Sequence, residues 1–195
     1  PLPHSHAHAE TLAPELVVLD EAYFEYVEES HYPDGLTRLR DHPNLVVTRT
    51  FSKIHGLAGL RIGYGYGSPE MIGLLQQARQ PFNANSVAQA TAIGALEDGD
   101  WVDLCRRRNR DGLEQVKAGC LKMGLEVVPS HANFLLVQVG DGKKVFEELQ
   151  AMGIITRPMP PPLNEFLRIS IGTEVQNERV LKALGSLMKK RGTDS

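Results

Sequence analysis

The segment that decides the fold covers residues 48–65 and reads TRTFSKIHGLAGLRIGYG. It places Lys53 directly after Ser52, continues through glycines and an alanine, and puts Arg61 eight positions after the lysine. The apolar run NLVVTRT (44–50) leads into it. Short apolar runs bounded by turn residues are typical of strands buried in a parallel sheet. The pattern therefore predicts a lysine-bearing turn at the end of a buried strand.

The surrounding sequence predicts further strands and helices. LVVLD (16–20) is an apolar run that ends in Asp20, a pattern typical of a strand buried on both faces. DGLTRLRDHP (34–43) is expected to be helical, LRIGYGYG (60–67) to be a strand, and residues 69–80 to form a helix. Strands that alternate with helices favour a parallel sheet covered by helices.

Residues 86–97 and 101–123 have helical patterns, and the DGD at 98–100 separates them. We therefore expect two domains: residues 1–98 as part of a large domain and residues 99–195 as a smaller one. The fold class predicted is α/β, with a large parallel or mixed sheet followed by a smaller α/β domain. The elements expected in the second half are LEVVPS (125–130), ANFLLVQV (132–139), a helix (143–152), GIITRP (153–158), FLRISIG (166–172) and a last helix (174–190).

Composition excludes several classes of protein. The 195 residues are 42% hydrophobic and 23% charged, with a net charge of −3, so no global charge attracts nucleic acid or an anionic membrane. RRRNR (106–110) is interpreted as a solvated helix face. No apolar run approaches the length of a membrane-spanning helix, and no signal-peptide pattern is present. Cys105 and Cys120 lack metal-ligand spacing and are expected to be reduced thiols of a cytoplasmic protein.

The N-terminal segment PLPHSHAHAETLAPE (1–15) is predicted to be a loop that runs into a short helix or disorder. Its alternating His4, His6 and His8 are interpreted as part of a mobile tract, and no metal site is predicted. The first residue is Pro1, so the numbering is consistent with a start inside a longer reading frame. The origin of that start stays open.

Five side chains form a chemically consistent set. Asp20 and Tyr23 follow the carboxyl end of a predicted strand, where open α/β sheets bind ligands, and Lys53 follows the next strand. Desolvation beside a sheet edge makes a lysine amine a nucleophile for a carbonyl. A carboxylate such as Asp20 favours a cationic partner, and the protonated pyridine nitrogen of pyridoxal phosphate fits that role. Ser52 and Arg61 suit the cofactor phosphate, the arginine as a two-pronged donor.

Motifs along most of the chain resemble the class I/II pyridoxal-phosphate-dependent aminotransferases, and within them the histidinol-phosphate aminotransferase branch. The resemblance extends over residues 16–172. The motifs that carry it are VVLDEAYFEY (17–26), TRTFSKIHGLAGLRIGYG (48–65), QPFNANSVAQA (80–90), ANFLLV (132–137) and FLRISIGT (166–173).

The resemblance implies a role for each residue of the cofactor set. Lys53 is the Schiff-base lysine and the general acid/base, Asp20 the partner of the pyridinium nitrogen, and Tyr23 a hydrogen-bond partner of the ring oxygen. Ser52 and Arg61 bind the cofactor phosphate. The implied fold is fold type I, with a large cofactor domain, a small C-terminal domain and active sites at a homodimer interface.

The resemblance also implies the substrates. Arg168 grips an anionic group of the amino donor, and Arg157 assists with the substrate's phosphate or carboxylate. The implied reaction transfers the amino group of histidinol phosphate to 2-oxoglutarate in histidine biosynthesis. Other aminotransferases and threonine-phosphate decarboxylase-like enzymes share the lysine and the anion grip, and the arginine pair does not separate them.

Two departures from the family pattern matter. The further phosphate ligands, the aromatic residue that stacks on the ring and the NPNNPTG-like motif of the family's N-terminal half are not in this sequence, which resembles the C-terminal half. RPMPPPLNEFLR (157–168) replaces a glycine-containing loop that is slightly longer in the family. A catalytically inactive fragment is therefore a second hypothesis. A nucleotide-binding oxidoreductase is disfavoured, because GYGYG (63–67) lacks G-x-G-x-x-G spacing.

Overall fold

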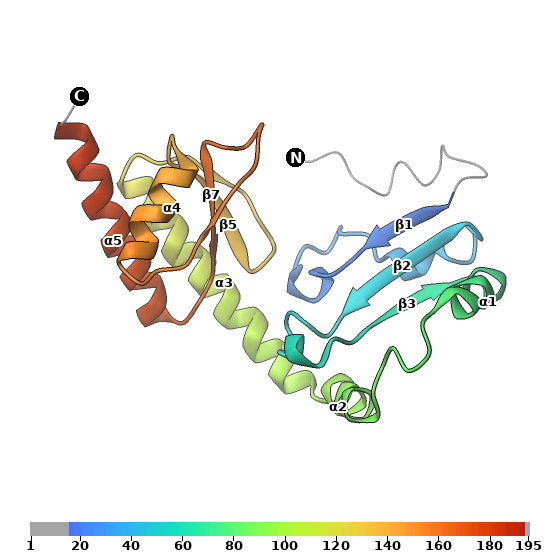
Figure 1. Cartoon of the computed structure of the whole chain (residues 1–195). Coiled ribbons are helices and arrows are strands. Elements are labelled where there is room, and N and C mark those ends of the chain that lie inside the picture. Colours follow the sequence, from blue (N-terminus) through green and yellow to red (C-terminus); the bar gives the residue numbers. More distant parts are fainter. Residues whose placement is uncertain (1–15, 194–195) are drawn as a thin grey trace. The chain divides into compact units, whose positions relative to one another are not determined.

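The computed structural model of the chain describes residues 16–193, with side chains to residue 190. This part forms two compact units that divide after residue 103, inside the long helix α3 (Gly99–Lys122), which Figure 1 shows in yellow-green. The domain boundary expected between residues 98 and 99 lies at the start of this helix and stays a prediction. The loop and the histidine tract expected at residues 1–15 lie outside the described residues. Those histidines are His4, His6 and His8.

The first unit is built on a three-stranded sheet in the order β1 (Val17–Asp20), β2 (Leu45–Thr50), β3 (Gly63–Gly67). β1 and β2 are parallel, whereas β3 is antiparallel to β2 (Figure 1). The expectation of a parallel sheet is therefore wrong for β3. Residues 51–62 join β2 to β3 through turns and the short 3-10 helix η4 (Ala58–Leu60), and this link reverses the chain without a crossover helix.

A hydrophobic core of the unit lies against one face of this sheet. The residues that form it are Leu19, Leu45 and Val47, each at most 7% exposed. Leu36, from the short 3-10 helix η3 (Gly35–Arg38), packs against them. On the opposite face of β1, Val18 is 54% exposed. Within residues 16–193 the expectation that this strand is buried on both faces is thus wrong, because the face of β1 that carries Val18 is largely exposed.

Two further expectations need correction at the ends of elements. Of the helix expected at residues 34–43, only η3 forms, because the Asp34 carboxylate accepts from the Leu36 N–H at 3.0 Å and sets up a single tight turn. The strand expected from residue 60 begins at Gly63. Arg61 has φ 52°, a left-handed conformation that extended strands do not contain.

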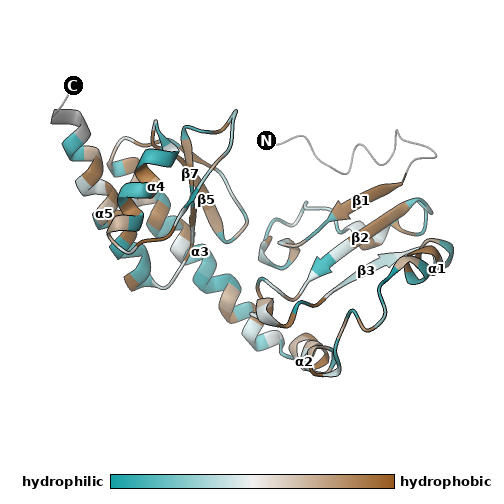
Figure 2. Ribbon diagram, in the orientation of Figure 1, coloured by the Kyte–Doolittle hydropathy of each residue, from teal (hydrophilic) through white to brown (hydrophobic). Residues whose placement is uncertain are grey.

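Two capped helices follow β3. α1 (Pro69–Ala78) and α2 (Ser86–Glu97) begin after Ser68 and Asn85, whose side chains accept from backbone N–H groups three residues later. α2 is apolar on most of its sides (Figure 2). Its large side chains with at least 60% exposure are Val87, Ile93 and Leu96.

The second unit holds a four-stranded sheet in the order β4-β5-β7-β6, in which all neighbouring strands are antiparallel. The remainder of α3 and two more helices belong to this unit (Figure 1). The elements are β4 (Val127–Val128), β5 (Phe134–Gln138), α4 (Gly142–Ala151), β6 (Arg157–Pro158), β7 (Phe166–Ser170) and α5 (Glu174–Thr193). They agree with the order expected from the sequence.

The core of the second unit lies between one face of this sheet and the three helices. Alternate residues along β5 and β7 supply the sheet side of the core: Leu135, Val137, Leu167 and Ile169. The helices supply Val116 from α3, Val145 and Leu149 from α4, and Leu184 from α5. Because side chains alternate across a strand, the intervening residues of β5 and β7 lie on the opposite face. Among the helices in residues 16–193, none is both long enough and apolar enough to cross a bilayer.

Both cysteines are free thiols on α3, as the sequence predicted. Cys120 is fully buried, and burial raises its pKa to about 11. Its thiol therefore stays protonated at neutral pH and is a packing group rather than a nucleophile.

Leu184 is completely buried between α5 and the sheet, whereas Leu121 on α3 is 54% exposed. We expect Leu184→Ala to lower the free energy of unfolding by about 2–5 kcal/mol, because it removes packed methyl groups and leaves a cavity. Leu121→Ala, the matched control, should change it by about 0.5 kcal/mol or less. Urea unfolding followed by circular dichroism measures both, and equal losses would contradict the packing described for α5.

Candidate functional site

The carboxyl ends of β1 and β2 bring the predicted cofactor residues to one edge of the first sheet. Asp20, the last residue of β1, is the register partner of Thr48 in β2. The Glu21 N–H extends this ladder by donating to the Thr48 carbonyl at 2.9 Å. The segments that leave the two strands therefore start side by side, one toward Tyr23 and the other toward Lys53. Parallel strands bind ligands at this edge.

Lys53 and Tyr23 are in direct contact. The Lys53 Nζ lies 5.1 Å from the centroid of the Tyr23 ring, within the range of a cation–π interaction. Tyr23 immediately precedes the short 3-10 helix η2 (Phe24–Tyr26). The structure thus joins two of the predicted site residues, which come from different strands and lie thirty positions apart.

The Lys53 turn is held by buried neighbours. Phe51 and Ile54, on either side of it, are at most 3% exposed, and the Trp101 indole N–H donates to the Ile54 carbonyl at 2.9 Å. The Lys53 carbonyl accepts from the N–H of Gly56, which has φ 73°. A positive φ of this kind favours glycine, so the turn requires glycine at position 56, three residues after the lysine.

The other three predicted cofactor residues, Asp20, Ser52 and Arg61, differ in their hydrogen bonds and surroundings. The Asp20 Oδ1 accepts from the Ala22 N–H at 3.1 Å, and its side chain is exposed at the sheet edge. Ser52 and Arg61 flank Phe51 and Ile62, which are joined by a backbone hydrogen bond of 3.3 Å. That bond brings the two predicted phosphate ligands to the same end of the loop. The Arg61 guanidinium donates to the Ala58 carbonyl at 2.9 Å and is exposed.

A buried ion network lies just behind this edge, and sequence reasoning missed it. The Arg49 guanidinium in β2 binds the Glu21 carboxylate and also the Asp34 carboxylate, at 2.9 and 2.8 Å. Burial by itself lowers the pKa of Arg49, but the hydrogen bond with Glu21 and the charges of both acids outweigh burial and raise the pKa above its usual range. The sequence offered no local signal for it, because Arg49 stands between Thr48 and Thr50 and its acidic partners lie 28 and 15 residues earlier.

The two predicted substrate arginines are neighbours in the second unit. Arg157 in β6 is the register partner of Arg168 in β7, so both side chains start on the same face of the sheet. This face is opposite the helix-covered core. The Arg168 guanidinium lies 4.8 Å from the Phe134 ring centroid, and its buried Nε has no hydrogen-bond partner among the described residues. Two guanidinium groups with a spare buried donor are suited to an anion.

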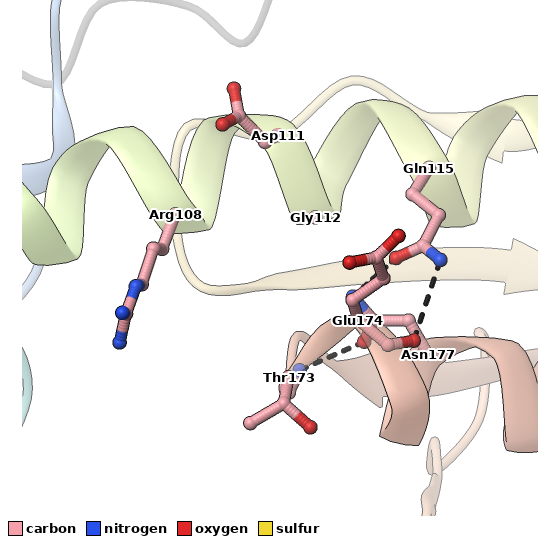
Figure 3. Close-up of a pocket in the computed structure, with 8 residues that line it drawn as sticks. Arg108, Asp111, Gly112, Gln115, Thr173, Glu174 and Asn177 are labelled. Atoms are coloured by element: carbon pink, nitrogen blue, oxygen red, sulfur yellow. Dashed lines mark hydrogen bonds between the residues drawn. The ribbon is translucent and has the colours of Figure 1, made fainter.

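A concave region lies elsewhere in the second unit. It has a volume of about 670 Å³ and is formed by α3 and the start of α5 (Figure 3). Asn177 at its base is 2% exposed, accepts from the Gly172 N–H and donates to Gln115, both at 2.9 Å. None of the predicted site residues lines this pocket, and its buried amide has partners, so it is a groove between packed elements rather than the chemical site.

The fold and the lysine-bearing edge define a class of enzyme. The chain belongs to the aminotransferase class I and II family, whose model matches residues 7–184. This confirms the resemblance found in the sequence and the fold class inferred from it.

The more specific similarity is to histidinol-phosphate aminotransferases. The chain is 47% identical over 175 residues to histidinol-phosphate aminotransferase 2 of Pseudomonas fluorescens, covering 89% of this chain and 47% of that protein. It is also 47% identical over 186 residues to histidinol-phosphate aminotransferase 1 of Dechloromonas aromatica, covering 94% and 51%. The crystal structure of the Sinorhizobium meliloti histidinol-phosphate aminotransferase in complex with pyridoxal-5'-phosphate superposes with a TM-score of 0.87 and 30% identity, covering 96% and 53%. The chain thus spans about half the length of these relatives.

Like charges directly opposite each other destabilise a sheet, so Arg157 and Arg168 should repel each other when no anion lies between them. We expect Arg157→Gln to raise the unfolding temperature at low ionic strength by about 1–5 °C. The difference should shrink toward zero in about 1 M NaCl, because salt screens the repulsion. Lys182→Gln on α5 removes another exposed cation and is the control. An Arg157→Gln effect that is independent of salt would contradict the opposed pair.

Proposed function

We propose that the protein is a pyridoxal-phosphate-dependent aminotransferase that transfers the amino group of histidinol phosphate to 2-oxoglutarate in histidine biosynthesis. The family and the 47% identical relatives support the reaction class and the amino donor. One structural observation carries the proposal for this chain. The Lys53 Nζ lies over the Tyr23 ring at the edge of the sheet where Asp20 ends its strand.

The residues at this edge fit pyridoxal phosphate. An amine, a carboxylate and a phenol lie on segments that leave neighbouring strand ends, and a serine and an arginine share the adjacent loop end. When bound, the cofactor supplies an aldehyde for amino groups and a ring that stabilises negative charge at the substrate carbon. We propose Lys53 for the aldehyde, Asp20 for the ring nitrogen and Tyr23 for the ring oxygen. Ser52 and Arg61 are proposed for the phosphate.

Each of these side chains has a defined task. The Lys53 amine would hold the cofactor through its aldehyde, as an imine formed with loss of water, and Nζ would serve as the group that takes up and returns a proton, a general acid and base. The Asp20 carboxylate accepts a hydrogen bond and holds a proton on the ring nitrogen. The Tyr23 ring contacts Nζ and would therefore help to orient the amine.

The arginine pair of the second unit is proposed to bind the substrate anion. Arg168 offers a buried Nε donor without a partner among the described residues, and Arg157 starts directly opposite it. A phosphate or carboxylate between them would relieve their repulsion and accept charge-assisted hydrogen bonds. By the family resemblance, we also propose a homodimer that works in the cytoplasm.

A second candidate is a chain that is inactive by itself. It follows from the family resemblance, because the NPNNPTG-like motif of the family does not occur in these 195 residues. Such a chain would bind pyridoxal phosphate weakly and would not turn over substrate.

Borohydride trapping tests the proposed lysine. The purified chain with pyridoxal phosphate should develop a visible absorbance band that borohydride removes, leaving a stable cofactor adduct that peptide mass analysis locates at Lys53. Lys53→Ala should lose the adduct, because the Lys53 Nζ is the amine that lies against the Tyr23 ring at this edge. Lys143→Ala, an exposed lysine of α4, is the matched control and should keep it. An adduct spread over surface lysines in all three proteins would refute the assignment.

Substrate kinetics test Arg168. Removing a charged hydrogen-bond donor costs about 1.5–3 kcal/mol, so Arg168→Gln should lower kcat/KM for histidinol phosphate by roughly 10–100-fold. The loss should be much smaller for an amino donor without an anionic group, such as histidinol. Lys182→Gln should leave both values unchanged. A chain that carries the Lys53 adduct and has no turnover with any donor would favour the inactive alternative.

A further inference from the structure

Arg49 contacts residues that are the chain neighbours of Asp20 and Tyr23, and it lies on the strand that leads to Lys53. It lies in β2 between Thr48, the register partner of Asp20, and Thr50. Since side chains alternate along a strand, Arg49 extends from the face opposite that of Thr48 and Asp20, the face that also carries the buried core. Arg49 is therefore not one of the predicted cofactor ligands, and its side chain lies on the sheet face opposite that of Asp20.

Its first partner is Glu21, the residue after Asp20. The Glu21 Oε2 accepts from Arg49 Nε at 3.1 Å and from Nη2 at 2.9 Å, a two-pronged contact between side chains that are 2% and 10% exposed. The other oxygen, Oε1, accepts from the Gly35 N–H at 2.9 Å. A Cβ at position 35 would lie 2.7 Å from that oxygen, so only glycine allows this contact. The carboxylate is thus held on both sides.

Its second partner is Phe24, the residue after Tyr23. The Arg49 guanidinium carbon lies 3.8 Å from the Phe24 ring centroid, a stacked cation–π contact. Its Nη2 also donates to Asp34 Oδ1 at 2.8 Å. A planar guanidinium can donate two hydrogen bonds to one carboxylate oxygen and present its flat face to a ring at the same time, which a lysine ammonium cannot do.

Two contacts of Arg49 are with residues that directly follow proposed cofactor ligands in the sequence. Glu21 adjoins Asp20, Phe24 adjoins Tyr23, and Arg49 itself stands four residues before Lys53 on the strand that leads into its turn. A buried ion pair is weak evidence for stability, because desolvation offsets much of its attraction. Its directional contacts fix backbone positions, and here two of the positions fixed, Glu21 and Phe24, are next to the proposed cofactor ligands Asp20 and Tyr23.

We propose that Arg49, through Glu21 and Phe24, is a positioning residue that sets the placement of Asp20 and Tyr23 relative to the Lys53 amine. The proposal rests on the proposed cofactor role of these three residues. It assigns a task to the buried network that stability alone does not require.

The test compares Arg49→Lys with Glu21→Gln, each in the whole chain. Arg49→Lys keeps the positive charge but loses the paired hydrogen bonds to Glu21 and the guanidinium contact with the Phe24 ring. Glu21→Gln keeps the side-chain shape but weakens the hydrogen bonds from Arg49, because the amide carries no charge. Both should weaken pyridoxal phosphate binding by roughly 10–100-fold, because small misplacements of a catalytic constellation cost about that much. The pH midpoint at which the visible band of the bound cofactor changes should move by about half a unit or more. Urea unfolding identifies the folded fraction, and if Arg49→Lys does not fold, Glu21→Gln decides.

Arg40→Lys is the matched control, since the Arg40–Asp41 pair at 3.4 Å is exposed. It should change cofactor affinity by about twofold or less. Folded variants with the parent's affinity and the parent's pH midpoint would overturn the proposal, as would a loss of stability without any change in the pH midpoint. Failure of the cofactor assignment looks different, because the parent chain itself would then show no band and no adduct at Lys53.

Discussion

The parallel pairing of β1 with β2 is the constraint on which the rest of the first unit depends. It ends both strands at one edge, so that the segments after Asp20 and after Thr50 leave the sheet together. Without this pairing the Lys53 amine and the Tyr23 ring, thirty residues apart, would have no reason to meet. Every chemical assignment in the first unit is a consequence of that alignment, and the arginine pair of the second unit follows the same logic in its antiparallel sheet.

The sequence allowed the proposed cofactor residues to be predicted because they follow apolar runs in a recognisable order. A carboxylate and a lysine placed after two buried strands are sufficient to predict a shared edge. The direction of β3 could not be predicted in the same way. It depends on the closed loop between Phe51 and Ile62, whose backbone hydrogen bond has no counterpart in the pattern of apolar residues.

The buried network around Arg49 was hidden for a related reason. In TRT (48–50) a charged residue between two threonines is typical of a strand face that meets solvent, and nothing local indicates an acid fifteen residues earlier. Only the fold brings Glu21 and Asp34 to the same guanidinium. The pattern of apolar and polar residues therefore cannot predict ion pairs between residues far apart in the sequence. It does predict the residues next to this network.

The open side of the first unit has a practical consequence for handling the protein. Within residues 16–193, Val18 lies exposed on the edge strand β1 and apolar side chains of α2 are exposed, and exposed apolar groups beside a sheet edge favour self-association. Preparations at high concentration should therefore form large particles before they unfold. Dilute, cold samples with a stabilising osmolyte are the suitable material for spectroscopy.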